Sequence, residues 1–342
     1  MIKEIITKLI DKKDLTRQEA YDVMQEIMQG QATPSQIAGF LVALRNKGET
    51  VKEIAGFALA MRDAAQSLHL HSDQLVDCCG TGGDGKGGLN LSTAVSFVAA
   101  GAGLIVAKHG NRAVSSHSGS GDVLEMMGVR IDPPPAVIEQ EIDQAGMGFM
   151  FAPLFHPAMK HAMPSRKELG IRTVFNILGP LTNPARVRVQ MIGVYDPRLT
   201  KVMASVMAEM GHRAGLVVHS NGWDEITLEG KTIISQMVKG KVKTFTWTHR
   251  DFGLPKISSK HLIGGDARKS ADFILELLSG KETPARSVVV ANAAALLFIA
   301  DKGYKKGTLT LKEAVIQANQ AIDTGKALEK FKLLAEISHN LE

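Results

Sequence analysis

Six of the nine residues from Gly80 to Gly88 are glycine, and this cluster constrains the fold more than any other feature of the sequence. It follows a short apolar run, LVDCCG, and leads into an apolar stretch that begins near Leu91. A glycine loop between a strand and a helix gathers backbone N–H groups at a helix N-terminus, where proteins commonly hold phosphate. The sequence therefore predicts a strand, an anion-binding loop and a helix in succession.

The chain beyond this loop continues to alternate short apolar runs with helical segments. Alternation of this kind is typical of a mainly parallel sheet covered on both faces, so we expect a large α/β domain over residues 71–342. The expected elements are strands at LIVAKHG, Val189–Tyr195 and Gly215–His219, a helix over Thr200–Gly211, a hairpin or edge strand over Val238–Trp247, and helices from Ala267 onward.

The first seventy residues read as helices instead. Three helix-start signatures follow one another, and in each a threonine precedes an acid or amide by three residues, so that the two side chains satisfy free backbone N–H groups reciprocally. The pairs are Thr16 with Glu19, Thr33 with Gln36, and Thr50 with Glu53. We expect a small helical domain over residues 1–70.

Composition narrows the class of protein. The only two cysteines, Cys78 and Cys79, are adjacent, which excludes a disulfide framework and a cysteine-based zinc site and favours a cytoplasmic location. The net charge of +5 comes from bases interleaved with acids, so we expect small anionic ligands and no binding to nucleic acid. The longest apolar stretches, 95–107 and 288–300, fall short of the ~20 residues that span a bilayer, and no secretory signal is expected.

Two nucleotide-binding interpretations of the glycine loop fail on the residues around it. A dinucleotide fold needs an acid at the end of the next strand, where this sequence has Lys108 and His109. A nucleotide-triphosphate loop needs Ser or Thr after Lys86, where Gly87 stands. The following loop, KHGNRAVSSHSGSGD, instead combines cations, hydroxyl groups and glycines, which suits a ligand with several phosphates.

Two further segments complete a resemblance to a known family. They are FAPLFHPAMKHAMPSRKELGIRTVFNILGPLTNPA, from Phe151 to Ala185, and the acid pair Asp224–Glu225. With the glycine loop and KHGNR, they resemble in order and spacing the anthranilate phosphoribosyltransferase family, whose members join anthranilate to phosphoribosyl pyrophosphate (PRPP) in tryptophan biosynthesis. The resemblance implies the nucleoside phosphorylase/phosphoribosyltransferase class of fold, a contribution of residues 160–185 to the helical domain, and a homodimer.

The resemblance also implies roles for individual residues. PRPP would lie against Gly80, Gly83, Asp84, Gly88, Asn90, Leu91, Ser92, Thr93, Lys108, His109, Gly110, Asn111, Arg112, Ala113, Val114, Ser115, Ser116 and Ser120. Anthranilate would lie against Gly80, Asn111, His156, Arg166, Gly179 and Pro180.

Magnesium is the implied cofactor, with two Mg2+ ions in each subunit. Ser92 would hold one ion and Asp224 with Glu225 the other, because hard cations prefer oxygen ligands. No dedicated general base stands out; His109 is a candidate proton acceptor, although a role in structuring its loop is favoured.

Three departures from the family and two rival functions are left. His117 stands where the family commonly has lysine, and the GGDARKSA stretch from Gly264 lacks the family's usual acid–Asn pair. Gly88 stands where the family often has a threonine that contacts PRPP, so we expect Gly88→Thr to lower the KM for PRPP. The rivals are an enzyme like the pyrimidine nucleoside phosphorylases and a non-catalytic relative that binds nucleic acid. KHGNR with Arg166 disfavours the first, and no basic stripe supports the second.

Overall fold

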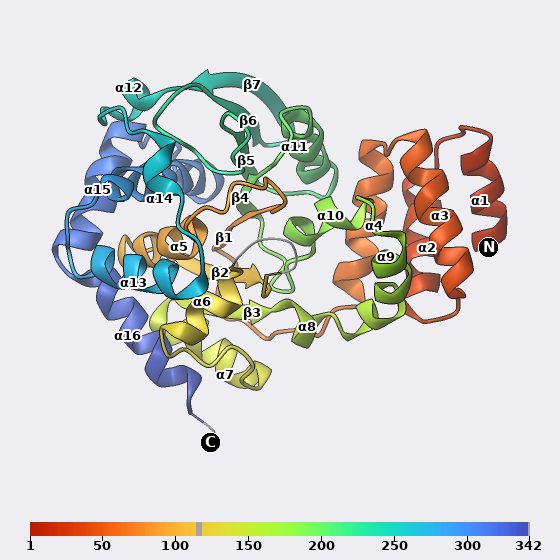
Figure 1. Cartoon of the computed structure of the whole chain (residues 1–342), viewed down its shortest axis with the longest axis horizontal. Helices are drawn as coiled ribbons and strands as arrows, with labels where there is room; N and C mark the ends of the chain where they lie inside the picture. The colour runs from red at the N-terminus through yellow and green to blue at the C-terminus, as the bar shows by residue number, and fades with distance from the viewer. Residues whose placement is uncertain (114–117, 341–342) are drawn as a thin grey trace.

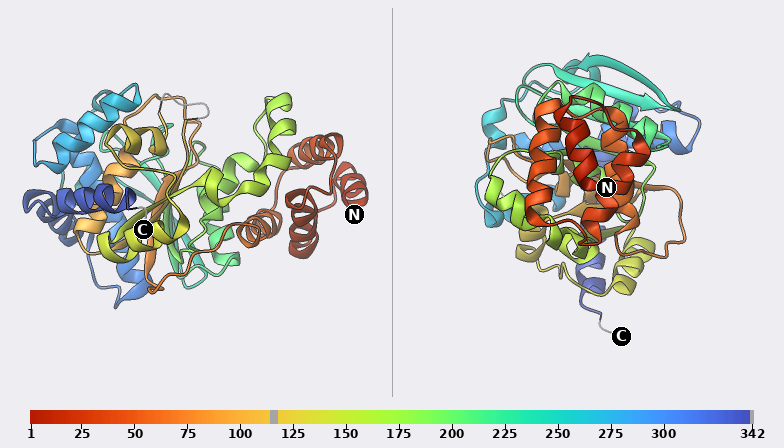
Figure 2. Two further views of the ribbon diagram at one scale, coloured as in Figure 1. Left: turned by 90° about the horizontal axis from the view of Figure 1, so that it is seen from below. Right: turned by 90° about the vertical axis from the view of Figure 1, so that its right-hand side faces the viewer.

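The computed structural model describes residues 1–113 and 118–340. A bundle of helices lies at one end and a larger α/β body at the other (Figure 1), and the side view in Figure 2 shows the two joined into an elongated molecule. The predicted fold class, a small helical domain with a large, mainly parallel α/β domain, is confirmed.

The centre of the larger body is a seven-stranded sheet of order β3-β2-β1-β4-β5-β6-β7. Its strands are β1 (Leu75–Gly80), β2 (Ile105–Gly110), β3 (Met147–Phe151), β4 (Val189–Gly193), β5 (Ala214–His219), β6 (Thr232–Val238) and β7 (Lys241–Trp247). The first five run parallel, whereas β6 and β7 form an antiparallel hairpin at one edge. The carboxyl ends of β1, β2 and β4 therefore meet on one side of the sheet.

Helices cover both faces of this sheet. The helices of the α/β body are α5 (Leu91–Gly101), α6 (Ser120–Met126), α7 (Pro135–Gln140), α11 (Leu199–Glu209), α12 (His249–Phe252), α13 (Ala267–Leu278), α14 (Pro284–Tyr304), α15 (Leu311–Asp323) and α16 (Lys326–Ser338). One face is buried under α5 and α14, with α15 and α16 packed behind them. The other face is buried under α11, which also contacts α4 of the helical bundle.

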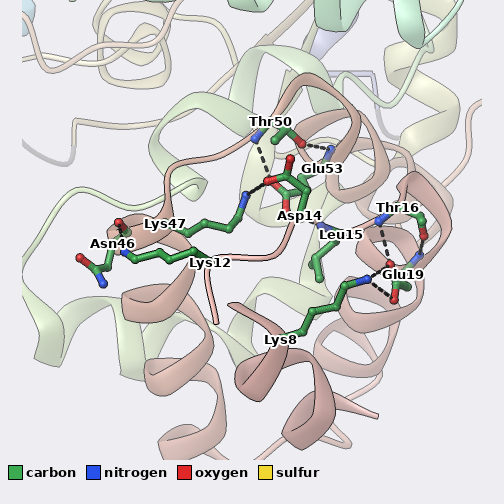
Figure 3. A network of polar contacts seen from close by, with 10 residues as sticks. All are labelled: Lys8, Lys12, Asp14, Leu15, Thr16, Glu19, Asn46, Lys47, Thr50 and Glu53. Carbon is green, nitrogen blue, oxygen red and sulfur yellow. Dashed lines mark hydrogen bonds and ion pairs between the residues drawn. The ribbon is translucent and has the colours of Figure 1, made fainter. Parts of the chain in front are cut away.

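The helical bundle consists of α1 (Ile2–Ile10), α2 (Arg17–Met28), α3 (Pro34–Lys47) and α4 (Val51–Asp63). All three predicted capping boxes form, with both reciprocal hydrogen bonds present in each. Figure 3 shows how one of them anchors the bundle: the buried Glu53 carboxylate accepts hydrogen bonds from the Thr50 and Leu15 amides and from Lys47 Nζ, at 2.7–2.9 Å. The same side chain thus caps α4 and fixes the α1–α2 connection.

A later segment of the chain joins the bundle. It comprises α8 (Ala152–Phe155), α9 (Met163–Leu169), α10 (Phe175–Leu178) and short 3-10 turns at Pro157–His161 and Gly179–Thr182. Helix α9 packs on α3, and Phe175, Leu178 and Leu181 enter the same apolar core as the bundle. That core continues through α11 to one face of β4–β6, so the two parts of the molecule share a buried boundary.

Several elements differ from the sequence prediction. Strand β3 was not predicted, because its five residues follow a π-helical turn, Glu141–Ala145, without a glycine or proline cluster ahead of it. The hairpin begins at Thr232 and turns at residues 239–240, so Val238 ends its first strand. Helix α14 is long and apolar enough to cross a membrane, but 83% of its most apolar window is buried, which makes it a core helix.

Glu141 gives the α/β body a pH-dependent stability. Its carboxyl group is buried, one oxygen has no partner and the other accepts the Phe149 amide at 3.2 Å. Burial raises its pKa to about 8, so the folded protein keeps a proton that the unfolded chain releases near pH 4.3. The free energy of unfolding should therefore fall as pH rises from about 4.3 through 8, by on the order of 2–4 kcal/mol.

The Glu141→Gln variant should lose most of this slope, because an amide does not ionise. Urea unfolding at pH 5, 6.5 and 8 measures it, with Glu168→Gln on the exposed side of α9 as the control. Equal slopes in wild type and the Glu141→Gln variant would contradict the assignment.

Candidate active site

A cavity of about 680 Å3 opens at the carboxyl ends of β1, β2 and β4, between the sheet and the segment that joins the helical bundle. This is where ligands bind in open parallel sheets. Most of the predicted site residues line it. They are Gly80, Gly83, Asp84, Gly88, Asn90, Leu91, Ser92, His109, Gly110, Asn111, Arg112, Ser120, His156, Arg166, Gly179, Pro180, Asp224 and Glu225.

The glycine loop owes its path to four left-handed residues. Gly82, Gly83, Gly85 and Gly87 have φ between +61° and +75°, a region that other residues rarely adopt. The loop delivers the chain to α5, whose first turn is capped by the Asn90 side chain accepting the Thr93 amide at 3.3 Å. The glycine loop and the first turn of α5 therefore line the cavity together, a combination that suits an anion.

Gly80 makes room for the neighbouring acid pair. A Cβ atom at residue 80 would lie 2.1 Å from Asp224 Oδ2, and one at residue 193 would lie 1.5 Å from the Asp224 carbonyl oxygen. The absence of side chains at these two strand ends lets Asp224 approach the sheet, where its Oδ2 accepts the Gly82 amide at 2.9 Å. Gly80 also lines the cavity, and its contact with anthranilate stays a prediction.

Three acids lie close together at this corner of the cavity. Burial and the neighbouring carboxylate of Asp84 raise the pKa of Asp224, while burial and Asp224 raise the pKa of Glu225. In the described chain, no three His, Cys, Asp or Glu side chains are arranged to hold a metal ion by themselves. Carboxylate oxygens of this kind are the ligands that hard cations prefer.

Lys108 differs from its predicted role. Its side chain is fully buried, and Nζ donates to the Cys78 carbonyl at 3.0 Å and to Ser92 Oγ at 3.2 Å. The side chain points under the cavity floor because alternate residues of a strand face opposite sides of the sheet. Lys108 therefore does not line the cavity and supports Ser92 from below.

Two other predicted PRPP residues do not reach the cavity. Thr93 is fully buried in the first turn of α5, and Ala113 is exposed, with its amide donating to Asp122. Arg112 does line the cavity, but its guanidinium is already paired with Glu125 and Asp122. Val114, Ser115, Ser116 and His117 lie outside the described residues.

Arg166, unlike Arg112, has no carboxylate partner among the described residues. Its guanidinium lies 5.0 Å from the ring centre of Phe175, and Nη1 approaches Met163 Sδ at 3.6 Å. In the described part of the chain it forms no ion pair, and burial lowers its pKa. A half-buried guanidinium that contacts an aromatic ring and a thioether is suited to an anionic ligand.

Two histidine rings line the cavity close to each other. The ring centres of His109 and His156 are 5.1 Å apart, and burial lowers their pKa values to about 3 and about 4. Both rings are therefore neutral at pH 7, and Nε2 of each is buried without a hydrogen-bond partner. Such a low pKa disfavours His109 as a proton acceptor and favours the role of structuring its loop.

The structure adds residues that the sequence analysis missed. Arg172 donates to the Gly83 carbonyl at 2.5 Å and stacks 4.0 Å over the ring of Tyr195, which clamps the glycine loop to the segment before α10. Trp223 forms the wall beside Gly88. An arginine and an aromatic ring more than twenty residues apart carry no local signal that they stack.

The contact with Trp223 reverses the expectation for Gly88. A Cβ atom at residue 88 would lie 2.6 Å from Trp223 Cζ3, so a threonine there must displace a buried indole. Overpacking of this kind costs about 1–3 kcal/mol, so Gly88→Thr should raise the KM for PRPP on the order of tenfold. Steady-state kinetics measure this KM, and the Gly88→Ala variant should have a KM between those of wild type and the Gly88→Thr variant. A lowered KM in the Gly88→Thr variant would restore the original expectation.

The cavity thus combines three chemical surfaces: a glycine loop with a helix N-terminus, a corner of carboxylates, and a guanidinium without an ion pair in the described part of the chain. Such a site can bind a phosphorylated substrate with a divalent cation and hold an organic acid beside it.

Two models from one protein family match the helical bundle and the α/β body of this chain. Residues 3–65 match the helical bundle domain of a glycosyl transferase family, and residues 72–328 match the a/b domain of the same family. Together the two matches cover most of the chain.

Individual relatives extend over the whole chain. An anthranilate phosphoribosyltransferase of Thermoanaerobacter sp. (strain X514) is 49% identical over 342 residues, all of both chains. The crystal structure of the Thermus thermophilus enzyme is 42% identical and superposes with a TM-score of 0.92, covering 98% of this chain and 99% of that one. The Saccharomyces cerevisiae enzyme in complex with PRPP and Mg is 27% identical, with a TM-score of 0.87, over 98% and 97% of the two chains. Fold, cavity and full-length similarity agree, and the chain belongs to the anthranilate phosphoribosyltransferase family.

Proposed function

We propose that this chain transfers the phosphoribosyl group of PRPP to the amine of anthranilate, giving N-(5-phosphoribosyl)anthranilate and pyrophosphate. It is a pentosyltransferase of tryptophan biosynthesis. The observation that carries the proposal is a single cavity in which Arg166, from the helical side, faces the same space as the glycine loop and acids at the strand ends.

Magnesium fits the oxygen groups at that corner. Ser92 Oγ, Asp224 and Glu225 are hard ligands, and burial beside other carboxylates raises the pKa of both acids. Ser92 would hold one ion and the acid pair a second, so each subunit uses two. When bound, magnesium neutralises charge that develops on the departing pyrophosphate. The S. cerevisiae relative, solved with PRPP and Mg, supports this use of the metal.

PRPP lies along the glycine loop and the start of α5. Amides of the loop and of the α5 N-terminus supply directed donors for its phosphates, while Asn111 and Ser120 add polar groups at the end of β2. Arg172 holds the loop in place through the Gly83 carbonyl. Lys108 does not contact PRPP itself and instead orients the Ser92 hydroxyl through its hydrogen bond to Ser92 Oγ. Val114, Ser115 and Ser116 remain predicted contacts.

Anthranilate lies at the other end, with its carboxylate on Arg166. A planar guanidinium pairs well with a benzoate carboxylate, and the ring is bordered by His156 and the Gly179–Pro180 turn, with Asn111 nearby. The S. cerevisiae relative in complex with 4-fluoroanthranilate supports an aromatic acid in this family's site.

The reaction then depends on alignment and charge. The C–O bond between the ribose anomeric carbon and pyrophosphate breaks, the ring gains oxocarbenium character, and the unprotonated aromatic amine attacks from the opposite face. Arg166 fixes the amine in line, and the loop amides stabilise the leaving group. The amine proton leaves to solvent or pyrophosphate, since buried neutral His109 is a weak base.

The remaining proposals concern the whole molecule. The chain divides into a small domain, 1–70 with residues 160–185, and a large domain, 71–342; the packing of α9 on α3 supports this division. It forms a homodimer, which the exposed Ile10 and Val42 on the bundle surface support. The free cysteines Cys78 and Cys79 support a cytoplasmic location.

Anthranilate fluorescence tests the proposed function directly. Signal should fall with time only when enzyme, PRPP and magnesium are all present, and excess chelator should stop the loss. If folded protein leaves the signal unchanged, the proposal fails; phosphorolysis of pyrimidine nucleosides, or salt-dependent binding to nucleic acid, would then identify one of the rivals.

A further inference from the structure

A fully buried polar network lies under the turn that borders the anthranilate end of the cavity. It contains Asp77 on β1, Gln190 on β4 and Asn183 after the 3-10 turn Gly179–Thr182. Asp77 Oδ2 accepts hydrogen bonds from Asn183 Nδ2 at 2.9 Å and from Gln190 Nε2 at 3.1 Å. None of the three side chains lines the cavity.

The carboxylate sets which way both amides face. Asp77 Oδ2 accepts a hydrogen bond from both amides, so each amide turns its NH2 group toward Asp77. The second N–H of each amide then reaches a backbone carbonyl: Asn183 donates to Ala107 at 2.9 Å, and Gln190 donates to Pro180 at 2.6 Å. The network thereby ties β1, β2 and β4 to the turn.

The Gly179–Thr182 turn presents backbone carbonyl groups to His109 and His156. The Gly179 carbonyl is a hydrogen-bond partner of the His109 ring, and the Thr182 carbonyl is a partner of the His156 ring. Because Nε2 of both rings has no partner among the described residues, we expect Nδ1 of each ring to donate to the turn. A neutral imidazole that donates through Nδ1 keeps a lone pair on Nε2, so the turn fixes one tautomer in both rings.

We infer that Gln190 is a positioning residue: its amide, oriented by Asp77, fixes the Gly179–Thr182 turn and through it the tautomer and orientation of His109 and His156 beside the bound aromatic acid. This inference rests on the proposed function only in naming that acid. A small displacement of groups that align a reactant can cost up to about 100-fold in rate, which gives a residue outside the cavity a kinetic effect.

The test replaces Gln190 by methionine, which keeps the volume and removes its hydrogen bonds to Asp77, Pro180 and the Cys79 thiol. The Gln190→Met variant should lower kcat/KM for anthranilate at least about tenfold, with the KM for PRPP within about twofold of wild type. Gln236→Met is the matched control, because Gln236 lies on β6 of the same sheet and its Nε2 has no partner. It should leave both parameters unchanged.

Nitrogen-15 NMR of the histidine rings supplies a readout that a structural role alone would not move. In wild type, His109 and His156 should show protonated Nδ1 and unprotonated Nε2, and in the Gln190→Met variant the signals should shift toward the other tautomer. If Gln190→Met does not fold, Asp77→Asn gives the same test, since an amide at residue 77 lets the Gln190 amide turn over.

The positioning role of Gln190 and the proposed function are contradicted by different results. An Nε2–H tautomer in wild type, or equal loss of anthranilate and PRPP affinity in a folded Gln190→Met variant, would refute the positioning role. Wild-type protein that has the predicted tautomers but does not consume anthranilate would refute the proposed function and leave the network standing.

Discussion

The Arg166→Ala variant should raise the KM for anthranilate by about 10- to 100-fold while the KM for PRPP stays within about twofold of wild type. Hydrogen bonds to a charged group contribute about 1.5–3 kcal/mol each, and alanine removes the whole guanidinium. The cation has an aromatic ring and a thioether as neighbours, so no protein carboxylate replaces the lost partner. The effect should therefore fall on the aromatic acid alone.

Two comparisons sharpen this prediction. Arg166→Lys keeps the charge but loses the planar pair of donors, so its KM should lie between wild type and the Arg166→Ala variant. Arg198→Ala removes an exposed arginine that is paired with Asp196, and should change nothing. Equal loss of both substrates in the Arg166→Ala variant would mean that the carboxylate site has been misplaced.

Neutralising the acid pair should produce effects of opposite sign on activity and stability. Asp224→Asn and Glu225→Gln each remove a negative oxygen from the cation site, and kcat/KM should fall at least about 100-fold. In chelator, however, the same variants should melt at a higher temperature than wild type, because burial beside other acids disfavours both charged carboxylates.

Activity across a magnesium titration and melting curves in chelator measure these two effects. Asp272→Asn on the exposed side of α13 is the control and should match wild type in both. Unchanged magnesium dependence, or melting temperatures below that of wild type in chelator, would contradict a cation site at Asp224 and Glu225.

Local patterns in the sequence were sufficient for the parts of the fold that are determined locally. The capping pairs at Thr16, Thr33 and Thr50 each place the start of a helix within one turn, and the glycines between β1 and α5 have the left-handed conformations that such a loop requires. The order of strand, loop and helix then placed the cavity at the correct end of the sheet.

Contacts between distant segments were beyond the sequence. Lys108 and Arg112 appear in KHGNR as two cations free to bind phosphate, yet one points beneath the floor and the other is paired with Glu125 on α6. Nothing at Gly88 reveals that Trp223 fills the adjacent space. In each case the partner lies on another element, and only the packed structure brings the two together.

The role of Gly80 shows the same limit in another form. Gly80 was singled out as a substrate contact, but the sequence did not reveal that the Asp224 carboxylate fills the space where a Cβ atom would stand. Composition at a position indicates that space is needed, whereas the three-dimensional arrangement decides what occupies it.

The stoichiometry of the reaction tests the central claim most directly. With PRPP, anthranilate and magnesium, the enzyme should release one pyrophosphate for each anthranilate consumed, and the product should have the mass of a phosphoribosyl adduct of anthranilate. Without anthranilate, pyrophosphate release should be negligible. Pyrophosphate released at the same rate with and without anthranilate, or anthranilate left unconsumed, would contradict a phosphoribosyl transfer between these two substrates.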